Sequence, residues 1–145
     1  MPANAAIYIA DPSILGSRTL DAIGEVQSYE GLTRDQQASG LQLRLAWGTV
    51  ALNFIPSGQL QDHLAGLRSY AEQVIEDENT LVYALARISH VRMCLGCVIE
   101  HQPDSESAAQ QFLFRLNSEL NGLLFLYDSI FDRDGQPLGG PATVE

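Results

Sequence analysis

The stretch that decides the fold is LQLRLAWGTVALNFI, residues 41–55. From Leu41 to Leu45 a leucine occupies every second position, which is the period-two pattern of a strand with one buried face. Gly48-Thr49 has the chemistry of a two-residue turn that begins with glycine, and Val50 to Ile55 continues as a second apolar strand. The stretch therefore predicts an antiparallel β-hairpin.

On the C-terminal side of this hairpin, apolar residues change between helical and strand spacing. The spacing predicts a long helix from Leu60 to Ile75, followed by a short helix capped by Asn79 or Thr80. A central strand is expected from Val91 to Ile99, and a long helix from Pro103 to Leu120 that stops at Asn121-Gly122. A last strand is expected from Leu123 to about Phe131, followed by a turn at Asp134-Gly135.

On the N-terminal side, Ala5 to Ala10 is expected to form a short buried strand. Asp11 is placed to cap a helix that follows it, with Pro12 at the first helical position. Residues 24–40 are rich in Gly, Gln, Ser and charged residues, and we expect a long loop there. Loops of this length are uncommon in compact domains, so it is either a lid or contact loop or a simple insertion.

The order of these elements, β-α-β-β-α-α-β-α-β, predicts one α+β domain over residues 1–145. We expect a mixed sheet of roughly five strands packed against three to four helices. Residues 136–145, which contain two Pro and two adjacent Gly, are expected to form a loose C-terminal tail.

Charge excludes several classes of partner. The chain has 18 acidic residues against 8 basic ones and a formal net charge of −10. All the basic residues are Arg, a bias typical of a GC-rich bacterial genome, and they are scattered along the chain. Nucleic acid and anionic membranes both need clustered basic residues, so neither is an expected partner. The short N-terminal apolar block has no basic residue before it and is ended early by Asp11-Pro12, so no signal peptide is expected. The cysteines are few, which fits a reducing cytoplasm, and we therefore expect a cytoplasmic protein.

Four residues of types that bind metals lie close together in the sequence, at His90, Cys94, Cys97 and His101. On a helix the ends of this array would be about 16 Å apart, too far for one zinc ion. On the predicted strand, Cys94 and Cys97 point to opposite faces, which disfavours a zinc knuckle and a disulfide. The pair also lacks the helix N-terminus at which a thioredoxin-like redox motif places its first cysteine. We therefore expect two buried thiols, no metal and no cofactor.

Three further residues are candidates for a cleft or binding site: Asp11, His63 and Asp128. Asp11 follows the first strand, where open sheets place ligand-binding groups, although its simplest role is to cap a helix. His63 borders the apolar stripe of the long helix and could act as a general base. Asp128 begins an acidic stretch that departs from the calcium-loop pattern and fits a hairpin turn better.

These observations favour a non-enzymatic module that binds another protein. Its acidic surface would attract a basic partner, as in an immunity-type protein that neutralises a toxin. The alternative is a small hydrolase that uses His63 with the carboxylates of Asp11 or Asp128. A third option is self-association, because an open sheet leaves unpaired edges.

Overall fold

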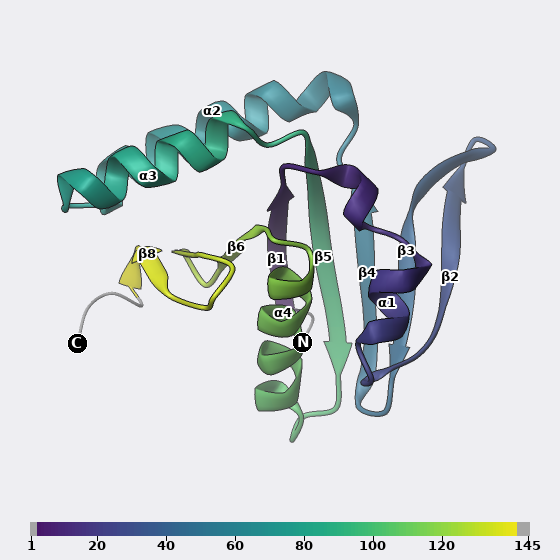
Figure 1. Cartoon of the computed structure of the whole chain (residues 1–145). Helices are drawn as coiled ribbons and strands as arrows, with labels where there is room; N and C mark the ends of the chain where they lie inside the picture. Colours follow the sequence, from purple (N-terminus) through teal and green to yellow (C-terminus); the bar gives the residue numbers. More distant parts are fainter. Residues whose placement is uncertain (1–2, 142–145) are drawn as a thin grey trace.

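The computed structural model describes residues 3–141. It forms a single antiparallel sheet with the strand order β2-β3-β4-β5-β1-β6-β7-β8 (Figure 1). The strands are β1 (Ala3–Ile9), β2 (Val26–Arg34), β3 (Gln37–Leu45), β4 (Gly48–Phe54), β5 (Met93–His101), β6 (Leu123–Leu126), β7 (Ser129–Phe131) and β8 (Pro137–Gly139). The helices are the 3-10 helix η1 (Pro12–Ile14) and the α-helices α1 (Ser17–Ala22), α2 (Ser57–Val74), α3 (Glu78–Ser89) and α4 (Glu106–Glu119).

The prediction of a mixed sheet of about five strands is wrong, although the fold is α+β. The sheet has eight strands and every pairing in it is antiparallel. A single helix between two neighbouring strands would make them parallel, but β4 and β5 are joined by two helices. Since α2 leads away from the sheet and α3 returns, the chain enters β5 beside the end of β4, with Phe54 opposite Leu95.

The largest error concerns residues 24–40, which form no long loop. Most of this stretch is strand β2, which pairs with β3 through a turn at Asp35 and Gln36. Both turn residues have positive φ angles, 54° and 66°. This hairpin is hard to recognise in the sequence, because its turn contains no glycine. In addition, β2 is exposed on both faces, so the strand carries no apolar alternation.

Smaller differences have similar causes. The apolar run after α4 is divided into β6 and β7 by Tyr127 and Asp128, whose φ angles are 50° and 63°. The helix predicted after Asp11 is interrupted, so that η1 and α1 are separate elements. Strand β8 lies within the stretch expected to be a loose tail, and the last four residues of that tail, 142–145, lie outside the described residues.

The turn of the β3–β4 hairpin is two residues earlier than the predicted Gly48-Thr49 turn. Leu45 pairs with Gly48, so the turn residues are Ala46 and Trp47. Gly48 is needed for a different reason: a Cβ atom there would collide with the backbone carbonyl oxygen of Glu100 on the adjacent strand. The glycine permits the close approach of β4 and β5 at this end of the sheet.

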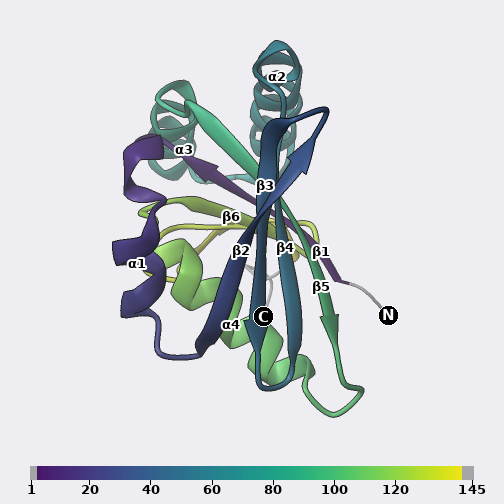
Figure 2. The same cartoon turned by 90° about the vertical axis from the view of Figure 1, so that its right-hand side faces the viewer.

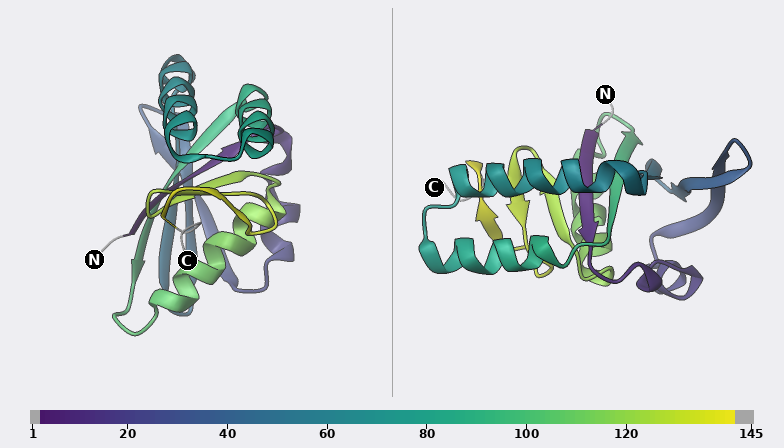
Figure 3. Two further views of the ribbon diagram at one scale, coloured as in Figure 1. Left: turned by 90° about the vertical axis from the view of Figure 1, so that its left-hand side faces the viewer. Right: turned by 90° about the horizontal axis from the view of Figure 1, so that it is seen from above.

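Each face of the sheet supports its own core. On the first face, α1 and α4 lie over the central strands (Figure 2), whose side chains on that face are buried. On the second face, α2 and α3 lie side by side over β1, β6, β7 and β8 (Figure 3). The first core contains Ile7, Ile9, Leu43, Leu52, Leu95, Ile99, Phe112 and Leu116, and the second contains Tyr8, Leu64, Leu67, Ala71, Ile88, Cys94 and Ile130. None of the helices formed by residues 3–141 has the length and apolar character needed to span a membrane.

The close approach at Gly48 can be tested with two glycine variants. Gly48→Ala is expected to lower the free energy of unfolding by about 1–3 kcal/mol, because the added methyl group displaces the backbone of β5. Gly66→Ala is the matched control, since nothing lies within 4 Å of the added atom in the interior of α2. It is expected to raise stability by about 0.5–1 kcal/mol. Urea denaturation measures both, and a shift of the same sign in the two variants would contradict the assignment.

Candidate functional site

The second face of the sheet is left open over β3, β4 and β5. Its side chains are small or polar and partly to fully exposed, in contrast to the buried leucines and isoleucines of the first face. The strand register places Gln42, Ala51 and Val98 in one row across this open face. The row nearer α2 contains Asn53 and Gly96 and continues through Ala6 to Phe125.

A pocket of about 420 Å³ lies where α2 crosses the sheet, at the β1 and β6 end of this open face. Tyr8 and Phe125 enter it from β1 and β6, and His63 and Tyr70 enter it from α2. Positions 63 and 70 are two turns apart and therefore share one flank of the helix. The remaining lining residues are Asp62, Gly66 and Leu67. We call this site the aromatic pocket.

The rings of the aromatic pocket are held in fixed positions. Tyr70 meets Phe125 edge to face, with ring centres 5.6 Å apart and planes at 74°. The hydroxyl of Tyr70 donates a 2.6 Å hydrogen bond to the backbone oxygen of Asp128. Tyr8 is buried, and burial raises the pKa of its hydroxyl, with a further contribution from the neighbouring Cys94. The pocket therefore presents neutral aromatic walls at physiological pH.

The structure brings only part of the predicted site together. His63 lines the aromatic pocket and is exposed at its rim. The backbone oxygen of Asp128 accepts the hydrogen bond from Tyr70, while the side chain of Asp128 is not part of the pocket lining. Asp11 caps η1, as one of the two interpretations proposed, with its carboxylate accepting hydrogen bonds from the hydroxyl and amide of Ser13 at 2.6 and 3.1 Å. These hydrogen bonds, with a contribution from Arg92, lower the pKa of Asp11.

Sequence reasoning missed three of the aromatic residues of the pocket. Tyr8 and Phe125 lie in apolar strands, where they resembled ordinary core residues. Tyr70 lies seven positions after His63 on the same helix, and this spacing was a usable signal. The sequence could not show that β1 and β6 are neighbours, which is what places two more rings opposite that flank.

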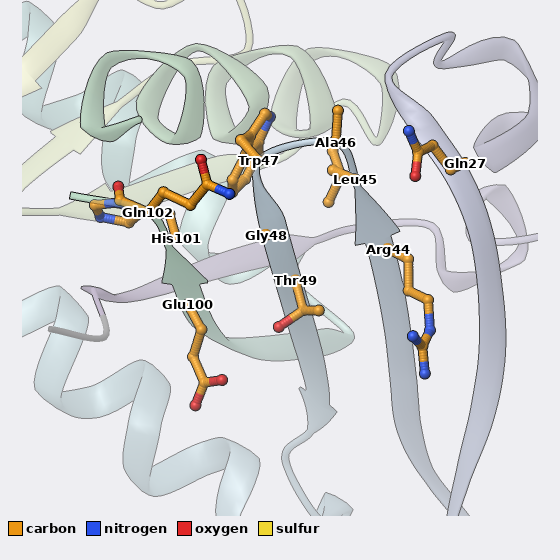
Figure 4. A pocket seen from close by; sticks show the side chains of 10 residues that line it. All are labelled: Gln27, Arg44, Leu45, Ala46, Trp47, Gly48, Thr49, Glu100, His101 and Gln102. Carbon is orange, nitrogen blue, oxygen red and sulfur yellow. The ribbon is translucent and has the colours of Figure 1, made fainter. Parts of the chain in front are cut away.

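A second hollow, of about 510 Å³, lies at the β3–β4 turn and the end of β5 (Figure 4). Arg44 and Glu100 lie on either side of Thr49 in one cross-strand row. Trp47 packs edge to face on Phe112 of α4, with ring centres 5.9 Å apart. The Nδ1 atom of His101 is 2.6 Å from the backbone oxygen of Gln102, so this nitrogen carries the proton. The hollow offers hydrogen-bonding groups of both charges, but its described lining residues include no hydrogen-bonded pair of acid and base.

The cysteines lie on opposite faces of β5, as predicted: Cys94 faces α2 and α3, and Cys97 faces the other core. Both are buried free thiols. Burial raises the pKa of Cys94 to about 11 and that of Cys97 to about 12, so neither is a thiolate nucleophile at neutral pH. Within residues 3–141, no three His, Cys, Asp or Glu side chains gather closely enough to hold a metal ion.

Part of the acidic stretch that follows β6 has a structural role. The carboxylate of Asp132 accepts hydrogen bonds from Arg87 at 2.8 Å and from the hydroxyl of Tyr83 at 2.6 Å, and it also accepts one from the backbone amide of Arg133 at 2.8 Å. Arg87 also donates to the backbone oxygen of Asn121. The network ties α3 to the turns that flank β6 and β7. Gly135 has a φ angle of 85°, in agreement with the predicted Asp134-Gly135 turn.

The buried thiols predict a loss of stability at alkaline pH. Above about pH 8.5 the cysteines of the unfolded chain ionise, while those of the native chain keep their protons until about pH 11 to 12. The unfolded state then binds fewer protons, so the free energy of unfolding falls between about pH 9 and 12, by about 1.4 kcal/mol per pH unit for each group.

Urea denaturation at a series of pH values measures this slope. Cys97→Ala is expected to remove one group's share of the slope, whatever it does to stability at pH 7. Val98→Ala, its neighbour on β5, keeps both thiols and should keep the full slope. Parallel curves for the two variants would contradict the assignment.

The Asp132 network predicts a second difference in stability. Asp132→Asn is expected to cost about 1–2 kcal/mol, because the amide weakens the charged hydrogen bonds from Arg87 and Tyr83. In Asp134→Asn the side-chain oxygen can still accept from the backbone amide of Gln136, so the change should stay within about 0.5 kcal/mol. Thermal or urea unfolding of the two variants distinguishes them, and equal losses would argue against the network.

No family model matches this chain, and searches of curated proteins and of solved structures found no match. What the protein binds therefore has to be inferred from its own side chains.

Proposed function

We propose that the protein is a non-enzymatic module that binds a basic protein partner, and that a Lys or Arg side chain of this partner enters the aromatic pocket. The observation that carries this proposal is the composition of the pocket. Tyr8, Tyr70 and Phe125 line it together with the carboxylate residue Asp62, and among the described residues no basic one other than His63 does so.

This composition suits a cationic side chain. The face of an aromatic ring attracts an ammonium or guanidinium group through its quadrupole, by about 0.5–2 kcal/mol according to how far the cation is desolvated. The long aliphatic stem of Lys or Arg would pack against Leu67 and the rings. Asp62 supplies a counter-charge at the exposed side of the pocket.

The surroundings of the pocket favour the same partner. Exposed acidic residues continue along α2 and into its connection with α3, at Glu72, Glu76, Asp77 and Glu78. Together with the net charge of −10, they would steer a basic protein toward this side of the molecule. The open face beside the pocket has short side chains at Ala6, Ala51 and Gly96, and it leaves room for the partner's backbone.

The hydrolase alternative stays a prediction and gains no specific support from the pocket. The one carboxylate in the described lining is that of Asp62, which is adjacent to His63 on a helix, and adjacent helical side chains do not face each other. No Ser, Thr or Cys is among the residues of the described chain that line the pocket. The raised pKa of the Tyr8 hydroxyl makes it a poor nucleophile.

A titration followed by NMR tests the proposal. The probe is the peptide acetyl-Gly-Arg-Gly-amide, added to the ¹⁵N-labelled protein. Binding in the millimolar range is expected, with the largest chemical shift changes at Tyr8, His63, Tyr70 and Phe125. Asp62→Asn should weaken this binding several-fold, because it removes the counter-charge.

Two controls separate pocket binding from general attraction to an acidic protein. The peptide acetyl-Gly-Glu-Gly-amide should leave the pocket signals unchanged. Glu72→Gln removes one exposed charge from the same helix outside the pocket lining, and it should leave the affinity nearly unchanged. If Asp62→Asn and Glu72→Gln weaken binding equally, or if the shifts spread over all acidic surfaces, the proposed site is wrong.

A further inference from the structure

Strand β2 forms one edge of the sheet and is attached to the molecule on one side only. Its pairing partner is β3, and no strand of the described chain lies along its other side. The tip of the β2–β3 hairpin lies at the periphery of the molecule in two perpendicular views (Figures 1 and 3). A nine-residue edge strand of this kind is a ready template for pairing with another chain.

The bulges in this hairpin define which part of β2 can pair. The register shift between Val26 and Ser28 places an extra residue, Gln27, in β2. The shift between Leu32 and Thr33 places its extra residue, Ser39, in β3 instead. Residues 28–34 of β2 are therefore a regular strand, in which Glu30, Leu32 and Arg34 share one face.

We propose that β2 pairs with β2 of a second copy of this chain, antiparallel, about a two-fold axis that passes midway between the two Leu32 residues. In this arrangement Glu30 of each copy lies opposite Arg34 of the other, and the two Leu32 side chains meet at the axis. The two sheets become one continuous sheet, in which the free edge of β2 in each copy is covered.

Symmetry leaves few alternatives to this register. Opposite residues of an antiparallel pair share a face, and the two-fold axis of such a pair is perpendicular to the sheet. One residue must therefore lie opposite its own copy, with the axis midway between the two. An axis at Glu30 would set two carboxylates directly opposite each other, which destabilises a sheet. An axis at Gly31 would pair Glu30 with Leu32 and leave both Arg34 side chains without an acidic residue opposite. The axis at Leu32 pairs each Glu30 with an Arg34 and sets the two apolar Leu32 side chains opposite each other.

The side chains involved are available for this contact. Glu30 and Arg34 are exposed, and neither makes an ion pair within the described chain. Leu32 is half-buried and belongs to neither core. The hairpin turn at Asp35 and Gln36 lies just beyond the paired residues, so the bodies of the two copies extend away from each other. Five paired residues make a small interface, and we expect a reversible dimer that depends on concentration.

Charge reversal tests the register. Sedimentation velocity over a range of concentrations should show a monomer–dimer equilibrium for the native protein. Glu30→Arg and Arg34→Glu should each weaken dimerisation by about tenfold or more, because each sets like charges opposite one another twice. The double variant should dimerise like the native protein. The two single variants, mixed together, should form a heterodimer, since one chain then carries arginine at both positions of the pair and the other carries glutamate at both.

A cross-link gives a second measurement that does not depend on charge. Leu32→Cys should form an intermolecular disulfide under mild oxidation, because Cα atoms of directly opposite residues lie about 4.5–5.5 Å apart, within reach of a disulfide. Ser28→Cys is the matched control on the same face of the same strand, and its two copies would lie far apart. Circular dichroism verifies that every variant is folded. A native protein that stays monomeric at all concentrations, or equal cross-linking of the two cysteine variants, would overturn the proposal.

Discussion

The antiparallel pair of β1 and β5 is the contact on which both cores depend. Ile7 and Leu95 are opposite each other and fully buried beneath α4 and α1. One step along, Tyr8 is opposite Cys94, and both are buried beneath α2 and α3. Because neighbouring residues of a strand point to opposite faces, this one pair of strands joins the two layers of helices. Where α2 and α3 cover this pair, apolar residues are therefore buried on both faces. Beyond these helices, β5 alternates between buried and more exposed positions from Leu95 to Glu100.

The same pair of strands explains where the surface is left free. Away from β1, the second face loses its helices, and the residues at those positions become small or polar, as at Ala51, Asn53 and Glu100. The first face stays apolar out to β3, where Leu43 is still fully buried. The aromatic pocket marks the border between the covered and the open part of the second face. An aromatic ring is suited to such a border, since it can pack on the core with one side and meet a ligand with the other.

The elements predicted well are those whose burial leaves a periodic pattern. The stripe of α2 and the alternating apolar residues of β5 depend on contacts at every second, third or fourth residue, and each is readable from sequence. The elements predicted poorly carry no such pattern. β2 is held mainly by its pairing with β3, and its turn uses Asp35 and Gln36 at positive φ, which sequence alone does not signal. His63 was identified because it borders an apolar stripe, whereas the other walls of its pocket depend on which strands are neighbours.

The two proposed interfaces lie at different places on one sheet, and their geometry connects them. Strand β1, which carries Tyr8, is separated from β2 by three strands, so the aromatic pocket lies about 20 Å from the edge at which two copies would meet. A two-fold axis perpendicular to the sheet keeps each face on its own side. A dimer would therefore carry one aromatic pocket on each half of its continuous sheet, roughly 40 Å apart before the twist of the sheet is considered. Because a twist of about 20–25° per strand accumulates over the strands between them, the two pockets would point in different directions, and each would bind its own basic segment.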